Sequence, residues 1–369
     1  MKVGIDIHAV GKQQTGNETY IRNLVGNLIG IDSDNTDYHL FYTHDDKLVV
    51  DERVEQTQIY PHQSVFRIPF VFPYQLRKQK IDVAHFQYVV PPVMKCPTVV
   101  MIHDISYEYH PEYFNPFECK RMKLLIPFSA RKSEHVLTVS EYSKQQIMQK
   151  YHIPEDKITV TYNGVNEQFC VLPSDADGYK CLTRFSFNKP FILAVGNLQP
   201  RKNIERLIRA YSKLRASGKI DLDLVLVGQV RWGGKAIFDE VETLGVKNNI
   251  HITGYVTDEE LVALYNKATL FAYPSLYEGF GLPLIEAMAC GTPVISSNAS
   301  CLPEVGGDAA HYIDPYSERG MMDALELVAN NSIVRKQLIQ KGFERASDFS
   351  WKRTAEKTLR VFEEVVASC

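Results

Sequence analysis

A glycine-rich segment with two glutamates carries the clearest chemical signal in the sequence. It follows the apolar run Leu270–Tyr273 and reads Y-E-G-F-G-L-P-L-I-E-A over residues 277–287. Its glycines let a ligand approach the backbone, and Pro283 suits the first turn of a helix, where free N–H groups bind hydroxyl or anionic groups. Glu278 in the loop and Glu286 in the helix can then face one ligand. Taken singly, Glu278 is more simply a cap-like residue and Glu286 part of a solvated helix face, but the whole string favours function.

Two adjacent cations follow another predicted strand. Arg201 and Lys202 stand between the run Phe191–Val195 and a helix that Asn203 can cap. The positive end of a helix dipole disfavours cations, so a nearby anion would resolve the conflict. A bidentate arginine beside a lysine suits a diphosphate. The alternative is a solvated basic pair at the tip of a loop.

Two further candidates follow strands in the first half of the chain. The loop 10–17 precedes a helix that Gly16 opens, so the amide of Gly16 can meet a phosphate; the alternative is a surface loop. It has neither G-x-G-x-x-G nor G-x-x-x-x-G-K-[ST], which argues against a dinucleotide fingerprint or a P-loop. The run Val100–Asp104 ends in His103 and Asp104 at the carboxyl edge of a strand, where a catalytic or sugar-contacting group belongs. The alternative for His103 is a core histidine bonded to backbone.

Metal and disulfide chemistry find little support. The Asp-x-Asp pairs at 32–34 and 221–223 have no histidine or extra carboxylate at ligand spacing, so we expect no metal site. Seven scattered cysteines, with no C-x-x-C, indicate reduced thiols in a cytoplasm.

The elements that must position these residues alternate between strands and helices. The expected strands are short apolar runs without alternation, typical of strands buried on both faces: 2–7, 39–42, 83–86, 98–103, 135–139, 191–195, 222–227, 270–273 and 293–296. The expected helices are 16–29, 116–132, 141–150, 204–217, 258–267 and 282–290. The class is therefore α/β with parallel sheets, whose ligands bind beyond the carboxyl ends of the strands.

A polar, aperiodic stretch divides this alternation. Residues 171–190 are expected to link an N-terminal Rossmann-like domain over 1–170 to a second one over 191–349. Apolar positions at helical spacing predict a terminal helix within 350–369 that packs on the N-terminal domain.

Charge and hydropathy limit the kinds of partner that the chain can bind. A formal net charge of −3 gives no bulk positive field for nucleic acid. The N-terminus is no signal peptide, and no apolar stretch approaches the roughly 20 residues of a membrane span. The segment 116–132 carries five basic residues among apolar ones, so it is either a helix lying on an anionic membrane or a packed helix with a solvated face.

Together these motifs resemble the retaining glycosyltransferases of family 4, which have the GT-B architecture of two Rossmann-like domains across a deep cleft. The resemblance covers nearly the whole chain and rests on the segments 16–20, 102–104, 139–141, 162–165, 195–197, 201–203 and 227–228 and on the spacing of Glu278 and Glu286. In 103–106 and 110–113 the chain is similar to bacterial O-antigen and exopolysaccharide mannosyltransferases.

The resemblance implies a role for each candidate. Arg201 and Lys202 would hold the donor diphosphate, with Gly16 and Asn17 approaching from the N-terminal domain; family members often have a second glycine where Asn17 stands. Glu286 would bind the ribose hydroxyls, and Glu278 would grip the donor sugar. His103 would sit at the anomeric centre. The resemblance places Tyr255 and Val256 near the nucleotide base. The remaining donor-binding positions are Gly196, Gly228, Gly279, Phe280, Gly281 and Leu282. No acceptor-binding residue is assigned.

We therefore expect a hexosyltransferase that moves mannose from GDP-mannose to a lipid-linked or oligosaccharide acceptor of a bacterial surface polysaccharide. Same-face displacement without metal or cofactor is expected, because the cations and helix ends can stabilise the leaving diphosphate. The expected place is the cytoplasm, at the inner face of the membrane. A UDP-sugar donor (glucose, galactose or GlcNAc), a sugar-nucleotide epimerase and a non-catalytic binding subunit remain alternatives; the missing glycine fingerprint disfavours an NAD-dependent dehydrogenase.

Overall fold

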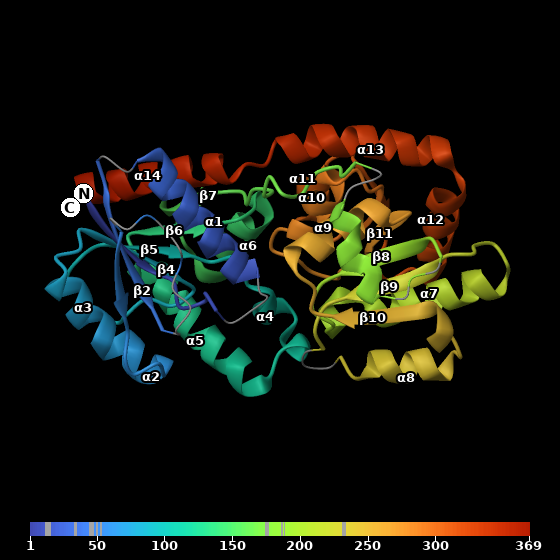
Figure 1. Ribbon diagram of the computed structural model, residues 1–369. Helices are drawn as coiled ribbons and strands as arrows, with labels where there is room; N and C mark the ends of the chain where they lie inside the picture. Colours follow the sequence, from blue (N-terminus) through green and yellow to red (C-terminus); the bar gives the residue numbers. More distant parts are fainter. Residues whose placement is uncertain are drawn as a thin grey trace. The chain divides into compact units, whose positions relative to one another are not determined.

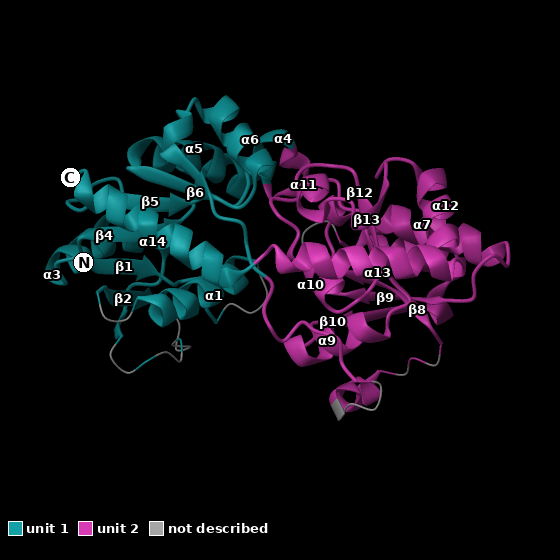
Figure 2. Cartoon of the chain, turned by 90° about the horizontal axis from the view of Figure 1, so that it is seen from above, with its two compact units in different colours: residues 1–109, 116–164, 350–369 teal, residues 110–115, 165–349 magenta. Residues whose placement is uncertain are grey.

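Two parallel β-sheets organise the chain (Figure 1). The computed structural model describes residues 1–11, 16–32, 35–43, 48, 51, 54–173, 177–185, 187, 189–230 and 234–369. These residues divide into two units (Figure 2): unit 1 comprises 1–109, 116–164 and 350–369, and unit 2 comprises 110–115 and 165–349. The predicted α/β class with two Rossmann-like parts is confirmed.

Unit 1 is built on a parallel sheet whose described strands follow the order β3-β2-β1-β4-β5-β6-β7. In register, Val3 of β1 lies between Tyr38 of β2 and Val83 of β4. The strands are β1 (Lys2–Asp6), β2 (Asp37–Tyr42), β3 (Glu55–Gln58), β4 (Val83–Gln87), β5 (Thr98–Met101), β6 (His135–Thr138) and β7 (Ile158–Val160). The helices are α1 (Gly16–Ile31), α2 (Ser64–Phe66), the π-helix η1 (Arg67–Val71), α3 (Phe72–Lys78), α4 (Ser106–Tyr109), α5 (Pro116–Lys132), α6 (Glu141–Tyr151), η3 (Glu155–Lys157) and α14 (Trp351–Ala367).

The last helix, α14, packs beside α1 in unit 1 (Figure 1). Two contacts fix the point where the chain re-enters this unit. A Cβ atom on Gly164 would lie 2.1 Å from the backbone nitrogen of Trp351, so only glycine permits this approach. The hydroxyl of Thr354 donates to the carbonyl of Tyr162. The terminal helix that the sequence predicts thus belongs with the N-terminal unit.

Unit 2 contains a second parallel sheet, in which the described strands follow the order β10-β9-β8-β11-β12-β13. The strands are β8 (Phe191–Val195), β9 (Asp223–Val227), β10 (Ile250–Gly254), β11 (Leu270–Tyr273), β12 (Val294–Ser297) and β13 (Ala310–Ile313). The helices are η2 (Pro111–Tyr113), η4 (Asp177–Arg184), η5 (Pro200–Lys202), α7 (Ile204–Ala216), α8 (Ala236–Thr243), η6 (Lys247–Asn249), α9 (Asp258–Lys267), α10 (Leu282–Ala289), α11 (Leu302–Gly306), α12 (Glu318–Asn330) and α13 (Ser332–Ser347).

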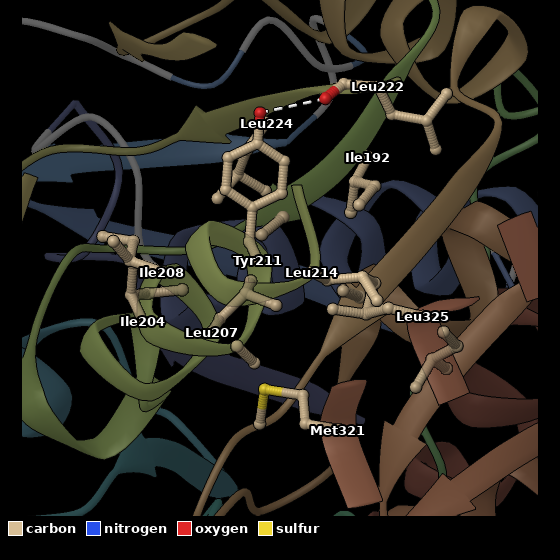
Figure 3. Close-up of a cluster of buried hydrophobic side chains, with 14 of the residues drawn as sticks. Ile192, Ile204, Leu207, Ile208, Tyr211, Leu214, Leu222, Leu224, Met321 and Leu325 are labelled. Atoms are coloured by element: carbon tan, nitrogen blue, oxygen red, sulfur yellow. Dashed lines mark hydrogen bonds between the residues drawn. The ribbon is translucent and has the colours of Figure 1, made fainter. Parts of the chain in front are cut away.

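The core of unit 2 fixes α7 against the sheet (Figure 3). Ile204, Leu207, Ile208 and Tyr211 recur at helical spacing and are all buried, so α7 presents one apolar face to β8 and β9. The Tyr211 hydroxyl is buried with them and donates to the carbonyl of Leu222 at 2.9 Å. This packing holds the start of α7, and with it the preceding cations, at the carboxyl end of β8.

The structure divides the chain differently from the predicted domain boundaries. The crossing between units falls between Gly164 and Val165, and the expected linker 171–190 contains η4, which packs on α9 in unit 2. Arg184 of η4 forms an ion pair with Glu260, which is part of the capping box at the start of α9. Its polar composition made this segment resemble a linker.

A short piece of the first half also belongs to unit 2. Residues 110–115 group with it, and the ring of His110 lies edge-on to Tyr277 with ring centroids 5.7 Å apart. The predicted domain over 1–170 therefore has an internal exception, which the sequence pattern did not indicate.

Candidate active site

Glycines shape the carboxyl edge of the unit 2 sheet. Gly196 and Gly228 directly follow β8 and β9, and Gly254 ends β10; their φ angles are +141°, +141° and +69°. The Gly196 amide donates to Val227, and the Gly228 amide donates to Gly254, both at 2.9 Å. A Cβ atom on Gly228 would lie 2.1 Å from the Gly196 oxygen. The two predicted donor-binding glycines are therefore in direct contact, and no larger residue fits at position 228.

Arg201, Lys202 and Glu278 form a buried charge cluster beside this edge. The Arg201 guanidinium donates to one Glu278 carboxylate oxygen at 2.6 Å, and the Lys202 ammonium donates to the other at 2.6 Å. Lys202 also donates to the hydroxyl of Tyr273 at 3.0 Å. Its side chain passes over Gly196, where a Cβ atom would lie 2.9 Å from the Lys202 Cε. The anion that the sequence required beside the two cations is thus supplied by Glu278.

Charge pairing keeps Glu278 ionised. Burial opposes ionisation, but the positive charges of Arg201 and Lys202 outweigh it and lower the pKa of Glu278 from 4.5 to about 2. At neutral pH the cluster holds two cations and one anion. It therefore keeps a net positive charge and suits an anionic ligand.

Asn203 differs from its predicted role. It occupies the N-cap position of α7 but has a left-handed backbone (φ +60°) instead of the extended one of a capping residue, and its side chain caps no amide. Its amide nitrogen donates instead to the carbonyls of Pro274 at 3.0 Å and Pro315 at 2.8 Å. Asn203 therefore ties the cation-bearing turn to the loops after β11 and β13.

The loop that carries Glu278 is pinned at several points. The Glu278 amide donates to the Ser300 hydroxyl at 2.9 Å, and the Cys301 thiol donates to the Glu278 carbonyl. Phe280 is buried edge-on against Phe349, so its side chain serves packing. Gly281 precedes α10 as its N-cap residue with φ +97°, and a Cβ atom there would lie 2.8 Å from Leu302.

Helix α10 begins as predicted, with Leu282 as its first residue and Pro283 in its first turn. Gly279 is buried in the preceding loop, whereas Leu282 is half-buried. These four positions, 279 to 282, therefore lead the backbone into the helix N-terminus, whose first amides have no partner within the helix.

Glu286 lies in α10 and has the opposite protonation preference to Glu278. Burial raises the pKa of Glu286 to about 8, although the Tyr265 hydroxyl, which donates to its carboxylate at 3.1 Å, works against the shift. Near neutral pH Glu278 is ionised and Glu286 is largely protonated. The two predicted glutamates are thus chemically distinct groups.

The predicted residues of the base site flank the end of β10. Tyr255 follows Gly254 directly and is exposed, whereas Val256 is buried. An exposed ring next to a sheet edge is available for stacking on a planar ligand.

In unit 1, His103 lies two residues beyond β5. Its Nε2 atom is 3.0 Å from the Gln87 side-chain oxygen, and its ring packs edge-on against Tyr20 with centroids 4.8 Å apart. Burial lowers the pKa of His103 to about 3, so the ring is neutral. The alternative of a ring bonded to backbone is not what the structure shows, because the ring's partner is a side chain.

The first loop is described only in part. Gly16 starts α1 and is exposed, and Asn17 follows it half-buried. Residues 12–15 lie outside the described residues, as do two of the three positions in the Asp-x-Asp pair at 32–34.

The second Asp-x-Asp pair is occupied by ion pairs. Asp221 accepts from Lys189 at 2.7 Å, and Asp223 pairs with His251 at 3.1 Å. Within the part of the chain that is described, no three histidine, cysteine or acidic side chains gather as metal ligands.

Sequence reasoning missed the partners of the predicted residues. Tyr265 lies in the helix predicted over 258–267 and Tyr273 ends the strand predicted over 270–273, and each bonds a candidate residue. Gln87 lies one residue beyond the strand predicted over 83–86 and ends β4. Only its place beside the strand that leads to His103 would have revealed it. Ser300 carries no motif at all.

Comparisons with known proteins decide the family. The model for glycosyltransferase family 4 matches residues 15–169, and the model for glycosyl transferases group 1 matches residues 183–345. O-antigen chain mannosyltransferase B of Escherichia coli is 32% identical over 266 residues, which cover 72% of this chain and 70% of that protein. The chain belongs to the family 4 glycosyltransferases.

Other relatives of this glycosyltransferase match over smaller shares. O-antigen chain mannosyltransferase RfbU of Salmonella typhimurium is 32% identical over 235 residues, covering 64% of this chain and 61% of that protein. Serotype-specific mannosyltransferase WbdA of Escherichia coli is 31% identical over 240 residues, which are 64% of this chain and 29% of WbdA. The match thus spans less than a third of WbdA.

Solved structures show the same fold. Sucrose-phosphate synthase from Thermosynechococcus elongatus superposes with a TM-score of 0.81 at 18% identity, over 100% of both chains. Anabaena HepE, solved with UDP-glucose, gives 0.76 at 18% identity, also over 100% of both chains. The glycosyltransferase therefore has the GT-B fold.

Proposed function

We propose that this glycosyltransferase transfers mannose from GDP-mannose to a glycan or lipid-linked glycan acceptor in the synthesis of a bacterial surface polysaccharide. The single observation that carries the donor class is the buried Arg201–Lys202–Glu278 cluster, with its net positive charge beside the glycine edge of unit 2. The choice of mannose is supported by the two O-antigen chain mannosyltransferases among the relatives.

Arg201 and Lys202 bind the donor diphosphate in this proposal. Both cations are paired with Glu278, so a diphosphate shares or displaces contacts that Glu278 makes now. An Arg guanidinium can bridge two oxygens of a diphosphate, and a Lys ammonium keeps three donors. Glu278, once released in part, can accept from hydroxyls of the donor sugar.

The other donor contacts follow from the same edge. Gly196 and Gly228 let the nucleotide lie close to the backbone, and the amides of residues 279–282 face the sugar. Glu286 accepts from the ribose hydroxyls. Tyr255 and Val256 lie beside the nucleotide base. Gly16 and Asn17, from the N-terminal half of the chain, approach the phosphate.

The reaction is a same-face displacement that retains the anomeric configuration. The acceptor oxygen forms a bond to the anomeric carbon as the carbon–oxygen bond to the diphosphate breaks. The electron pair stays on the diphosphate, and the acceptor proton passes to one of its oxygens. Arg201 and Lys202 stabilise the charge that develops there, which is the task a divalent metal performs in other transferases.

Unit 1 supplies a neutral histidine to this step. His103 contacts the sugar near the anomeric centre as a hydrogen-bonding group rather than as a cation. The carboxylate next to it, Asp104, accepts from the amide of Ser106 at 2.8 Å, which is a structural contact. The proposed step is direct displacement rather than a covalent intermediate on Asp104.

The test removes the two cations. Arg201→Ala with Lys202→Ala is expected to abolish mannosyl transfer from GDP-mannose to a lipid-linked acceptor. The matched control, Arg209→Ala with Lys213→Ala, removes two cations of α7 that pair with surface carboxylates and should retain activity. Full turnover in the first double variant would overturn the assignment.

The reaction products distinguish mannosyl transfer from the alternative functions. Transfer from UDP-glucose, UDP-galactose or UDP-GlcNAc would replace the mannose donor but keep the site. Free sugar products without an acceptor would indicate an epimerase. Nucleotide binding without turnover with any acceptor would indicate a non-catalytic subunit.

We also propose that α5 contacts an anionic membrane at its cytoplasmic face. Phe117 and Leu124 are 78% and 72% exposed on this helix. Five exposed basic residues, Lys120, Arg121, Lys123, Arg131 and Lys132, accompany them, which suits an anionic lipid surface. No helix among the described residues is long and apolar enough to span a bilayer.

Vesicle sedimentation tests this contact. The chain should sediment with vesicles that contain phosphatidylglycerol and not with pure phosphatidylcholine. Phe117→Ser with Leu124→Ser should weaken the binding, whereas Ile333→Ser, at an exposed apolar position of unit 2, should not. Equal sedimentation of both variants would remove the proposal.

A further inference from the structure

Gln87 fixes the protonation form of His103. Gln87 is the last residue of β4 and only 4% exposed, and its side-chain oxygen lies 3.0 Å from the His103 Nε2 atom. An amide oxygen can only accept, so Nε2 must carry the hydrogen. The neutral ring then has its lone pair on Nδ1, which leaves Nδ1 as the ring atom that can accept from another group.

The other end of the same amide has no partner among the described residues. The Gln87 side-chain nitrogen is buried and bonds to no group in the described part of the chain. A buried donor without a hydrogen-bond partner is destabilising and rare in folded proteins, so its presence calls for a reason. Gln87 stands at the carboxyl end of its strand, which is the edge where open α/β sheets bind ligands. A substrate hydroxyl would satisfy the free N–H.

The next residue adds a second sign of a functional site. Tyr88 has a left-handed backbone with φ +62°, which is rare for a residue with a large side chain. Strain of this kind persists where the surroundings enforce it, and it clusters at ligand sites. The Tyr88 ring lies 5.6 Å from the His103 ring, and the Tyr88 amide donates to Met101 at 2.8 Å. The chain therefore bends directly after Gln87, the residue that contacts His103.

The groups that face His103 from other elements do not supply a negative charge to its ring. Tyr20 packs against it from α1, and Ser143 of α6 donates to its backbone carbonyl at 3.1 Å. His85 of β4 is itself neutral, because burial lowers its pKa to about 4. Asp104, in the same loop, accepts from the amide of Ser106. Burial keeps the ring neutral, and the contact with the Gln87 amide oxygen sets which ring nitrogen carries the hydrogen.

We propose that Gln87 is a positioning residue that holds His103 as the neutral Nε2–H form and binds a hydroxyl of the substrate sugar through its free N–H. This inference deepens the proposed glycosyl transfer and rests on it for the nature of the substrate. The orientation of His103 does not depend on that function.

Two substitutions separate the two contacts. Gln87→Leu removes both the acceptor for His103 and the free N–H. Gln87→Glu keeps an acceptor for His103 but replaces a neutral group by a carboxylate, which stabilises the imidazolium and raises the pKa of His103. Gln56→Leu, a glutamine of β3 on the same sheet whose amide bonds Leu48, is the matched control.

The first readout is long-range ¹H–¹⁵N NMR of the histidine rings, with His103 assigned from the spectrum of His103→Asn. The wild type should show His103 as the Nε2–H form between about pH 5 and about pH 8. Gln87→Leu should shift the ring towards a mixture of forms, and Gln87→Glu should make it titrate within this range. A Nδ1–H ring in the wild type, or no change in either variant, would overturn the positioning role, whatever the enzyme transfers.

The second readout is the rate of sugar transfer. Gln87→Leu should lower kcat at least about tenfold and raise KM for the sugar substrate, with thermal stability close to that of Gln56→Leu. Gln87→Glu should lose activity as the pH falls from about 7 to about 5, where the wild type stays level, because the protonated ring cannot accept. An unchanged KM in Gln87→Leu would refute the contact between the amide and the sugar. Absence of transfer in the wild type, with the expected NMR result, would place the failure in the proposed function.

Discussion

Replacing Glu278 by glutamine tests the charge cluster at its centre. The change keeps the shape of the side chain but leaves Arg201 and Lys202 without the carboxylate that now accepts from both. The pKa of Glu278 is lowered from 4.5 to about 2, and 2.5 units of pKa correspond to roughly 3 kcal/mol of stability at neutral pH. Removing one member of a buried ion pair typically costs about 3–5 kcal/mol, which agrees.

The sign of the pH dependence follows from the lowered pKa. The ionised cluster stabilises unit 2 fully above pH 4.5, the unfolded value, and loses this contribution as the pH falls towards about 2. The difference between wild type and Glu278→Gln should therefore be complete at neutral pH and should shrink at about pH 3.

Hydrogen exchange of the β8 and β11 amides measures this effect in unit 2 alone, which matters because two units need not unfold together. We expect Glu278→Gln to lower the free energy of opening by roughly 3 kcal/mol at pH 7. Glu326→Gln, which breaks the exposed pair with Lys219, should lower it by less than about 1 kcal/mol. Equal effects of the two substitutions would refute the reasoning.

Pyrophosphate binding gives a second test of the charge cluster. In the proposed site Glu278 competes with the diphosphate for the same cations, so pyrophosphate without metal should stabilise Glu278→Gln more than the wild type in a thermal shift experiment. Weaker stabilisation of the variant would show that Glu278 assists the binding of the anion instead of competing with it.

Three further substitutions have clear expectations. Gly228→Ala should destabilise unit 2 by several kcal/mol in calorimetry, because a Cβ atom there would lie 2.1 Å from the Gly196 oxygen. The control Gly218→Ala, also at positive φ but in open space, should cost about 1 kcal/mol. Similar losses in the two variants would argue against the contact. Donor binding should tighten from about pH 6.5 to about pH 9 as Glu286, with its pKa raised to about 8, becomes a carboxylate, and titration calorimetry of Glu286→Gln should lose this trend. Gly164→Ala should lower the melting temperature by displacing α14, a result that unchanged protection of the α14 amides would contradict.

The parts of the fold that burial dictates were predictable from the sequence. The runs that became β8 and β11 are apolar on both faces because helices cover both sides of a parallel sheet, and the pattern shows this directly. The strand β3, with the sequence E-Q-T-Q, was missed because it has a neighbour on only one side among the described strands and its side chains are polar. An edge strand has little hydrophobic signal of its own.

Residue types in the sequence single out candidates for the site, but not the contacts that these residues make. The spacing of Glu278 and Glu286 and the Arg201–Lys202 pair stand out by residue type. Glu278 pairs with both cations because the loops after β8 and β11 lie side by side in the folded unit. No local sequence pattern encodes that arrangement. Gln87 was missed for the same reason, since it faces His103 only because β4 and β5 are neighbours in the sheet.

The most direct test of the proposed activity is the release of nucleoside diphosphate from a panel of GDP-, UDP- and ADP-sugars, measured in EDTA with and without a lipid-linked acceptor. The cationic cluster and the mannosyltransferase relatives predict release from GDP-mannose alone, with no need for a divalent metal. Release from a UDP-sugar instead, or release only after a divalent cation is restored, would contradict this account.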